Sequence, residues 1–221
     1  MKRWGRLLTA LVMIAATSYS LRPAMAQDRV TVGAELSTKN ARKEESNLAN
    51  VIADAIRDAA NSDIAFVAAS SFAEQSIPKG SASAEDFLKA LAFRNDPVVV
   101  VKLNGEKVKA ALEHGLALYP QMHSAFLHVS GVAVNVDPNE PRDRRVTSVK
   151  IGGAAIDDKK VYTVAMPSPL ADGGLAYYRI WSKSDIDKSK DPKVTLQEAV
   201  VKYLKGKSSV GGSGDRLVFK K

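Results

Sequence analysis

Alternating apolar and polar stretches along the chain predict a mixture of helices and strands. From Ser46 to Ala60 the apolar side chains recur at the spacing of an amphipathic helix with one buried face. The run from Ile64 to Ala69 is continuously apolar, which is typical of a strand buried on both faces. The β-branched run from Val98 to Leu103 predicts another interior strand, because the preceding Pro97 blocks continuation of a helix.

Similar patterns predict further helices and strands in the rest of the chain. Capping-box-like patterns begin two further helices, which are expected over residues 83–92 and 195–204. An Asn-Gly turn precedes a third helix, which is expected over residues 106–118. Strands are expected over residues 126–136 with a break at Gly131, over 146–151 as a hairpin partner, and over 161–166. No repeat and no Gly-, Pro- or Ser-rich linker divides residues 40–205, so the pattern predicts one α+β domain.

The first 26 residues are expected to be a cleavable secretory signal. Basic residues open the segment, and the apolar stretch from Leu7 to Ala16 is too short to span a bilayer. Ala24-Met25-Ala26 then supplies small residues at the positions that a signal peptidase reads. The alternative is an uncleaved membrane anchor. We therefore predict a periplasmic or secreted protein that starts near Gln27 and has no membrane span after cleavage.

Charge and cysteine content exclude several classes of function. The chain carries 32 basic and 24 acidic residues, and the loss of four basic residues with the signal lowers its net charge from +8 to +4. This mild excess argues against a nucleic-acid groove but suits a small anionic ligand or an anionic envelope surface. The chain has no cysteine, which excludes disulfides, thiolate catalysis and cysteine-ligated zinc.

The expected organisation is a signal peptide over residues 1–26, a polar lead-in over 27–41 that includes a short strand at 30–32, a domain over 42–205 and a flexible tail over 206–221. The segment Leu217-Val218-Phe219 either returns as an edge strand or frays.

Several sequence landmarks occur in a distinctive order. The stretch RKEESNLANVIADAIRDAANSDIAFVAASS begins at Arg42, and later landmarks are Gly80 before a capped helix, LAFRN at 91–95, NGEKV at 104–108, RRV at 144–146, YTVA at 162–165 and LADGG at 170–174. Over about residues 42–205 this order resembles the C-terminal, substrate-recognition domain of the 5'-nucleotidase and UDP-sugar hydrolase family. The resemblance implies a four-layer α/β/β/α fold of the α+β class.

The resemblance also implies a way of binding. In that family this domain holds the nucleoside part of the substrate between two aromatic rings, an Asn and an Asp bind base or ribose, and arginines face the phosphate. A separate N-terminal metallophosphoesterase domain holds two metal ions and performs the hydrolysis. The chain lacks that domain's Asp-x-His and Asn-His-Glu signatures, so we expect no catalytic residues, no bound metal and no cofactor.

Six residues match the family's binding positions: Arg42, Phe93, Asn95, Asp172, Gly173 and Gly174. Each of the first three has a simpler interpretation. Arg42 is equally expected as a solvated residue before a helix, Phe93 as a core residue, and Asn95 as part of the turn before Pro97.

Other binding positions depart from the family. The loop Asn-Gly-Gly-Gly-Ile-Arg is replaced by residues 69–74, which places Ala69 at the Asn position and Glu74 at the Arg position. Pro169 occupies the position of the family's second ring, and Leu175 occupies the position of the Asp that follows the paired glycines. Phe72, Tyr177 and Tyr178 lie nearby in sequence and are candidate substitute rings, although Phe72 suits packing within its loop equally well.

Histidines and serines add no sharper signal. The spacing of His114, His123 and His128 resembles no metal triad, and ordinary structural histidines are expected. Ser70-Ser71 lacks a nucleophile elbow, so serine hydrolysis is not predicted.

Two functional hypotheses follow. The first is an exported, noncatalytic module that binds a nucleoside, a nucleotide or a similar aromatic ligand. The second is an interaction subunit for another envelope protein, for example a separately encoded metallophosphoesterase, with the ligand cleft abandoned. The exposure of Phe93 distinguishes these two hypotheses in part, because a stacking role requires an accessible ring face opposite Pro169.

Overall fold

The computed structural model describes residues 29–212 and 214–220; the predicted signal segment, 1–26, lies outside them. None of the helices found there is both long and apolar enough to cross a membrane. The helices are α1 (Asn47–Ala60), α2 (Ala84–Leu88), α3 (Gly105–Gly115), α4 (Ser168–Ala171) and α5 (Leu196–Leu204). The strands are β1 (Arg29–Val32), β2 (Leu36–Ser37), β3 (Ile64–Ala68), β4 (Ser76–Ile77), β5 (Gly80–Ser83), β6 (Val98–Asn104), β7 (Leu127–Ser130), β8 (Val132–Val136), β9 (Val146–Ile151), β10 (Ala154–Ala155), β11 (Val161–Pro167), β12 (Ser209–Val210) and β13 (Leu217–Phe219).

The central sheet has the strand order β6-β11-β3-β7. β3 and β11 are parallel neighbours, whereas β6 runs antiparallel to β11 and β7 antiparallel to β3. The carboxyl ends of β3 and β11 therefore meet at the edge of the sheet where β6 begins.

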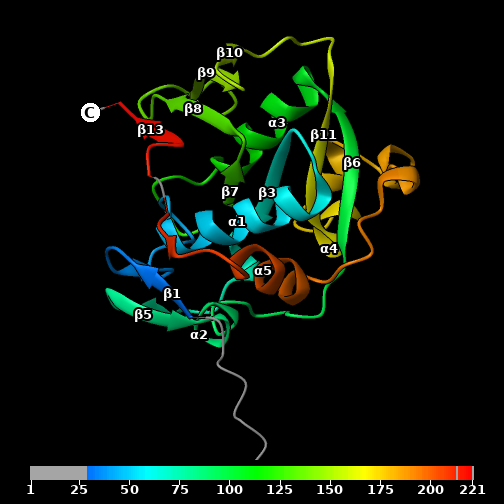
Figure 1. Cartoon of the computed structure of the whole chain (residues 1–221). Coiled ribbons are helices and arrows are strands. Elements are labelled where there is room, and N and C mark those ends of the chain that lie inside the picture. Colours follow the sequence, from blue (N-terminus) through cyan, green and yellow to red (C-terminus); the bar gives the residue numbers. More distant parts are fainter. Residues whose placement is uncertain (1–28, 213, 221) are drawn as a thin grey trace, which may run out of the picture.

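Alternate residues of the central strands face two hydrophobic cores. In β3, Ala65 and Val67 pack in the core formed with α1 and α5, whereas Ile64 and Phe66 pack in the core formed with α3. The second core also includes the inner faces of β8 and β9, from the sheet β10-β9-β8-β13. Figure 1 shows α1 and α5 on one side of the central sheet and α3 on the other. The predicted α+β class, with β-structure enclosed between helices, is confirmed.

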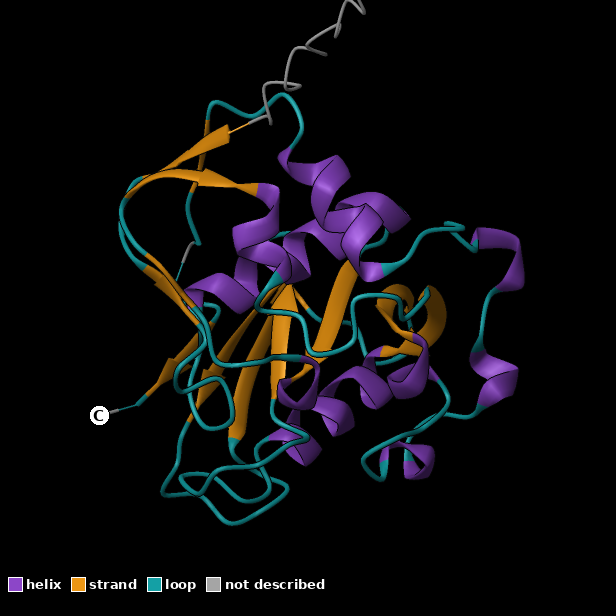
Figure 2. Ribbon diagram, turned by 90° about the horizontal axis from the view of Figure 1, so that it is seen from below, coloured by secondary structure: helices purple, strands orange, loops and turns teal. Residues whose placement is uncertain are grey.

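A third sheet, β12-β1-β5, joins the N-terminal segment to the core. β1 is its middle strand, parallel to β12 and antiparallel to β5. The side chains of Val30 and Val32 are buried in the same core as α1. Figure 2 shows these strands beside the helices at one side of the molecule.

The C-terminal segment returns to the second sheet as β13, which pairs parallel with β8 at its edge. The Arg216 guanidinium forms an ion pair with Asp54 (2.8 Å) and donates to the Val129 carbonyl (2.7 Å). The backbone N–H groups of Arg216 and Leu217 donate to the Glu45 carboxylate at 3.0 Å each. These contacts fasten the C-terminal strand to α1 and β7.

Most predicted elements appear within a residue or two of their expected bounds, and the largest difference is in α2. This helix ends at Leu88 instead of Ala92. The Ala92 N–H donates to the Ser71 carbonyl (3.0 Å), and the Ala73 N–H donates to the Ala90 carbonyl (2.9 Å). Pairing with the loop after β3 therefore replaces the last helical turn.

Two other local predictions can be compared with the structure. The break at Gly131 separates β7 from β8; its φ is +77°, and a Cβ there would meet the Asp63 carbonyl at 2.2 Å. α3 ends at Gly115, three residues early. The Arg145 guanidinium donates hydrogen bonds to the carbonyls of Leu116 (2.7 Å) and Tyr119 (2.9 Å), which follow the helix.

Candidate functional site

A cavity of about 330 Å³ lies at the sheet edge where β3 and β11 end and β6 begins. Crevices at the carboxyl ends of parallel strands are common ligand sites. The lining side chains are mostly apolar: Ala68, Phe93, Pro167, Pro169, Leu170 and Leu175, with Gly174 beside them. The polar lining residues are Ser70, Ser71 and Asp96.

Phe93 provides the large ring of this cavity. It follows the segment held against the loop after β3, and its side chain is 58% exposed. A phenylalanine is usually buried, so this ring leaves apolar surface accessible beside a mostly apolar cavity. Phe93 shares the cavity with Pro169, as the stacking hypothesis requires, and the alternative of a buried core residue does not hold.

Another part of the lining comes from α4 and the turn after it. Gly173 has a φ of +88°, and a Cβ on Gly174 would lie 2.7 Å from the Pro169 carbonyl oxygen. Leu175 and Ala176 also have positive φ values, 58° and 67°, which non-glycine residues rarely adopt. The His114 imidazole Nε2 lies 2.8 Å from the Leu175 carbonyl oxygen and holds this turn in place.

Asp96 brings a carboxyl group to the cavity from the turn that carries Phe93. Within residues 29–212 and 214–220, its carboxyl oxygens have no hydrogen-bond or ion-pair partner. Burial raises the pKa of this carboxyl, because desolvation disfavours its charged form. The cavity thus combines an apolar slot with one acidic group.

Asn95 and Asp172 do not line this cavity, although both match binding positions of the resembled family. The Asn95 Oδ1 accepts a hydrogen bond from Gln197 Nε2 at 2.8 Å, which ties the turn to α5. Asp172 is exposed and lies 3.5 Å from the Lys183 Nζ. Gly174 lines the cavity, whereas Gly173 shapes the turn behind it.

Arg42 lies in a different cavity, of about 370 Å³, together with Glu74 and Met122. The two cavities share no lining residue. The loop after β3 separates them, with Ser70 facing the first cavity and Phe72 facing the second. Arg42 therefore shares its surroundings with Glu74 rather than with Phe93.

Phe72 and Tyr177 do not offer a free ring face, so the structure gives no support to either as a substitute ring. Phe72 is buried and packs edge-to-face on His128, with 5.2 Å between the ring centres. Tyr177 is fully buried and stacks on Trp181 at 4.7 Å, and its hydroxyl donates to the Ala125 carbonyl (2.8 Å). Burial raises the pKa of the Tyr177 phenol well above its usual value. Both rings belong to the core.

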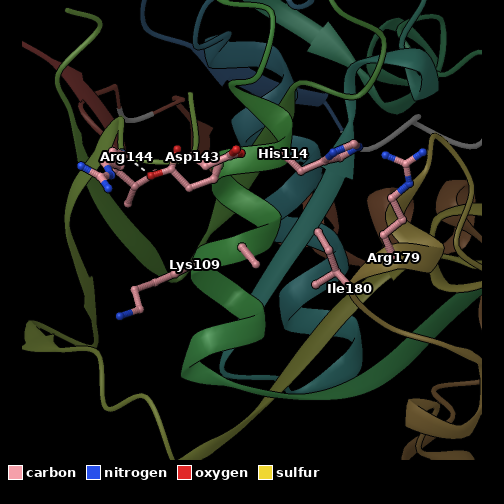
Figure 3. Close-up of a pocket in the computed structure, with 9 residues that line it drawn as sticks. Lys109, His114, Asp143, Arg144, Arg179 and Ile180 are labelled. Atoms are coloured by element: carbon pink, nitrogen blue, oxygen red, sulfur yellow. Dashed lines mark hydrogen bonds between the residues drawn. The ribbon is translucent and has the colours of Figure 1, made fainter. Parts of the chain in front are cut away.

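A larger cavity of about 730 Å³ lies beside α3. Two of its charged side chains are engaged in structural contacts: Lys109 pairs with Asp158 (2.7 Å), and the Glu113 carboxylate accepts from the Val146 N–H (2.7 Å). Figure 3 shows Lys109 and Arg144 on one side of α3 and Arg179 on the other. Because these cations do not converge on one point, we assign no ligand to this cavity.

The sequence interpretation missed Asp96, which it treated as part of a turn. Its position between Phe93 and Pro97 was visible, and the residue before a proline is restricted to extended backbone. No local pattern reveals, however, that residues of α4 line the same cavity as Asp96.

Comparisons with known proteins identify the family and the fold. A family model described as the 5'-nucleotidase C-terminal domain matches residues 24–180. An apyrase of Anopheles gambiae is 32% identical over 151 residues, which cover 62% of this chain and 25% of the apyrase. The 5'-nucleotidase of Vibrio cholerae is 32% identical over 139 residues, covering 63% of this chain and 24% of that protein.

Among solved structures, a 5'-nucleotidase precursor from Thermus thermophilus aligns with a TM-score of 0.75 and 27% identity. The alignment covers 88% of this chain and 40% of that chain. The chain thus spans about a quarter of the length of the two relatives above and less than half of the solved structure.

Proposed function

We propose that this chain, which belongs to the 5'-nucleotidase C-terminal domain family, is an exported module that binds a nucleoside-like ligand in the Phe93 cavity. The observation that carries the proposal is the exposed Phe93 ring, which lines a mostly apolar cavity together with Pro169. A planar base gains about 1–3 kcal/mol from stacking on an aromatic side chain. The flat apolar face of Pro169 completes the slot without adding a second π-system.

The charges favour nucleosides over nucleotides. In the part of the chain that the structure describes, no lysine or arginine lines the Phe93 cavity, whereas Asp96 does. Arg42 lies in the neighbouring cavity with Lys39 and Glu74, so these cations are separate from the Phe93 cavity and share their surroundings with a carboxylate. The lining suits recognition of a neutral ring, and we assign binding rather than hydrolysis to these residues.

Calorimetry with the purified protein tests the proposal, with adenosine, guanosine, cytidine and their monophosphates as ligands. We expect at least one nucleoside to bind, and to bind no more weakly than its monophosphate. Phe93→Ala should weaken that binding by about tenfold or more, since it removes the stacking face. Tyr178→Ala is the matched control, because it removes an equally exposed ring (64%) that does not line the cavity.

Equal loss of binding in both variants would count against the Phe93 site. A monophosphate that binds far more tightly than its nucleoside would contradict the charge argument. If neither nucleosides nor monophosphates bind, the result would support the second hypothesis, an interaction surface for another envelope protein.

Export is the other part of the proposal. It is supported by the basic and apolar pattern of residues 1–26 and by Ala24-Met25-Ala26. N-terminal sequencing of the protein recovered from the periplasm or medium should begin near Gln27. Recovery of the intact N-terminus in the membrane fraction would instead indicate an uncleaved anchor.

A further inference from the structure

We propose that Asp96 selects the ligand of the Phe93 cavity by accepting hydrogen bonds from N–H groups on the edge of the bound ring. Rings that present two adjacent N–H donors should therefore bind better than rings that present fewer. The inference rests on the proposed function, because it concerns the same cavity.

The turn that carries Phe93 also fixes Asp96. The Asp96 N–H donates to the Phe93 carbonyl (3.3 Å), and the Asp96 carbonyl accepts from the Leu196 N–H (3.0 Å). The backbone groups of Asp96 are thus both used within the protein. Its side chain and the Phe93 ring line the same cavity from one turn. A ring stacked on Phe93 would therefore bring its edge near the Asp96 carboxyl.

The Asp96 carboxyl is suited to accept hydrogen bonds from a ligand. An ionised carboxyl has two oxygens and no donor, so it discriminates strongly between N–H groups and lone pairs. The carboxyl is half-buried, which disfavours its charged form and agrees with its raised pKa, and a ligand N–H would stabilise that form. The other polar groups of the cavity, Ser70 and Ser71, are hydroxyls that both donate and accept, so they discriminate less.

The geometry of a carboxylate favours a particular class of ring. Two adjacent N–H donors match its two oxygens, whereas a carbonyl or a ring nitrogen lone pair at that edge would repel them. Guanosine presents a ring N–H beside an exocyclic amine, and inosine is the same nucleoside without the amine. The pair guanosine and inosine therefore isolates one hydrogen bond to the carboxylate.

The experiment measures the dissociation constants of guanosine and inosine by calorimetry for the intact protein and two variants. The unsubstituted protein should bind guanosine about tenfold or more tightly than inosine, as expected for one hydrogen bond to a charged group. Asp96→Asn keeps the size of the side chain but removes the charge and one acceptor, and it should reduce the preference to about twofold or less. Asp191→Asn makes the same change at an exposed turn far from the cavity lining and should keep the preference.

The outcomes separate the two proposals. If the unsubstituted protein binds guanosine and inosine equally, or Asp96→Asn keeps the tenfold preference, the role of Asp96 is wrong. If either result is obtained while Phe93→Ala still weakens nucleoside binding by about tenfold or more, the proposed function stands without the role of Asp96. If no nucleoside binds at all, both proposals are overturned. A thermal unfolding curve of Asp96→Asn that matches the unsubstituted protein excludes misfolding as the cause of a lost preference.

Discussion

His128 shows how a single buried group makes the fold sensitive to acid. The imidazole is fully buried in β7, and its Nε2 lies 2.8 Å from the Ala41 carbonyl oxygen. Burial lowers its pKa from 6.5 to about 4, and the nearby Arg216 charge adds to this effect. The folded state therefore holds His128 neutral at a pH at which the unfolded chain binds a proton.

We predict that the free energy of unfolding falls as the pH drops from 6.5 towards 4. The sign follows from the two pKa values of His128. Below pH 6.5 the imidazole is protonated in the unfolded state, whereas in the folded state it stays neutral down to about pH 4. Between pH 7.5 and 5 the loss should be about 2 kcal/mol. Urea denaturation at several pH values measures it. His128→Gln should flatten this part of the curve, whereas an unchanged slope in that variant would assign the effect to other groups.

At the residue scale the sequence predicted some side-chain environments and not others. For Phe93 the sequence left a core residue and an accessible ring both open, and the structure exposes the ring where polar residues bring the chain to the surface before Pro97. Tyr177 appeared equally available, yet it is enclosed by Trp181, four residues later, and by His114, which is far away in the sequence. A ring's exposure depends on what packs over it, and that information is tertiary.

At the scale of elements, β13 depends on contacts with residues far away in the chain. Arg216 precedes the strand, and its guanidinium is largely buried between α1 and β7, where it meets Asp54 and the Val129 carbonyl. The Asp54 carboxylate also accepts a hydrogen bond from the Ser130 hydroxyl (2.6 Å). Removal of the guanidinium would leave this carboxylate poorly compensated.

Arg216→Ala should therefore lower the free energy of unfolding by about 3 kcal/mol or more, as for other buried pairs that lose one partner. Arg94→Ala serves as the control, because Arg94 pairs with Glu85 at 2.9 Å and the two side chains are 35% and 47% exposed. That variant should change stability by less than about 1 kcal/mol. Urea denaturation compares the two, and equal effects would contradict the idea that Arg216 anchors β13.

Strands and long helices were predicted well because their signal is local. The apolar run of β3 and the periodicity of α1 each contain enough residues to identify the element. α2 was predicted four residues too long, since its last turn is replaced by pairing with the loop after β3. The capping box marked its start, but no residue within it marks its end.

At the scale of the whole molecule, the N-terminal segment is part of the fold rather than an addition to it. β1 lies between β5 and β12, and Val30 and Val32 are buried against α1. The sequence indicated the short strand but not its partners, which come from residues about 50 and 180 positions later. Parallel pairing between such distant segments leaves no local pattern.

We predict that a protein beginning at Gln27 folds stably, whereas one beginning at Gly33 is markedly less stable. Deletion of residues 27–32 exposes the apolar surface that Val30 and Val32 cover, and burial of each valine contributes about 1.5–3 kcal/mol. It also leaves the backbone groups of β5 and β12 without their partners. The midpoint of thermal unfolding should fall accordingly, while a protein beginning at Arg29, which keeps β1, should match the one beginning at Gln27. If the shorter protein fails to fold, Val30→Ala with Val32→Ala provides the milder test, and a stability unchanged by that pair would show that β1 contributes little to the core.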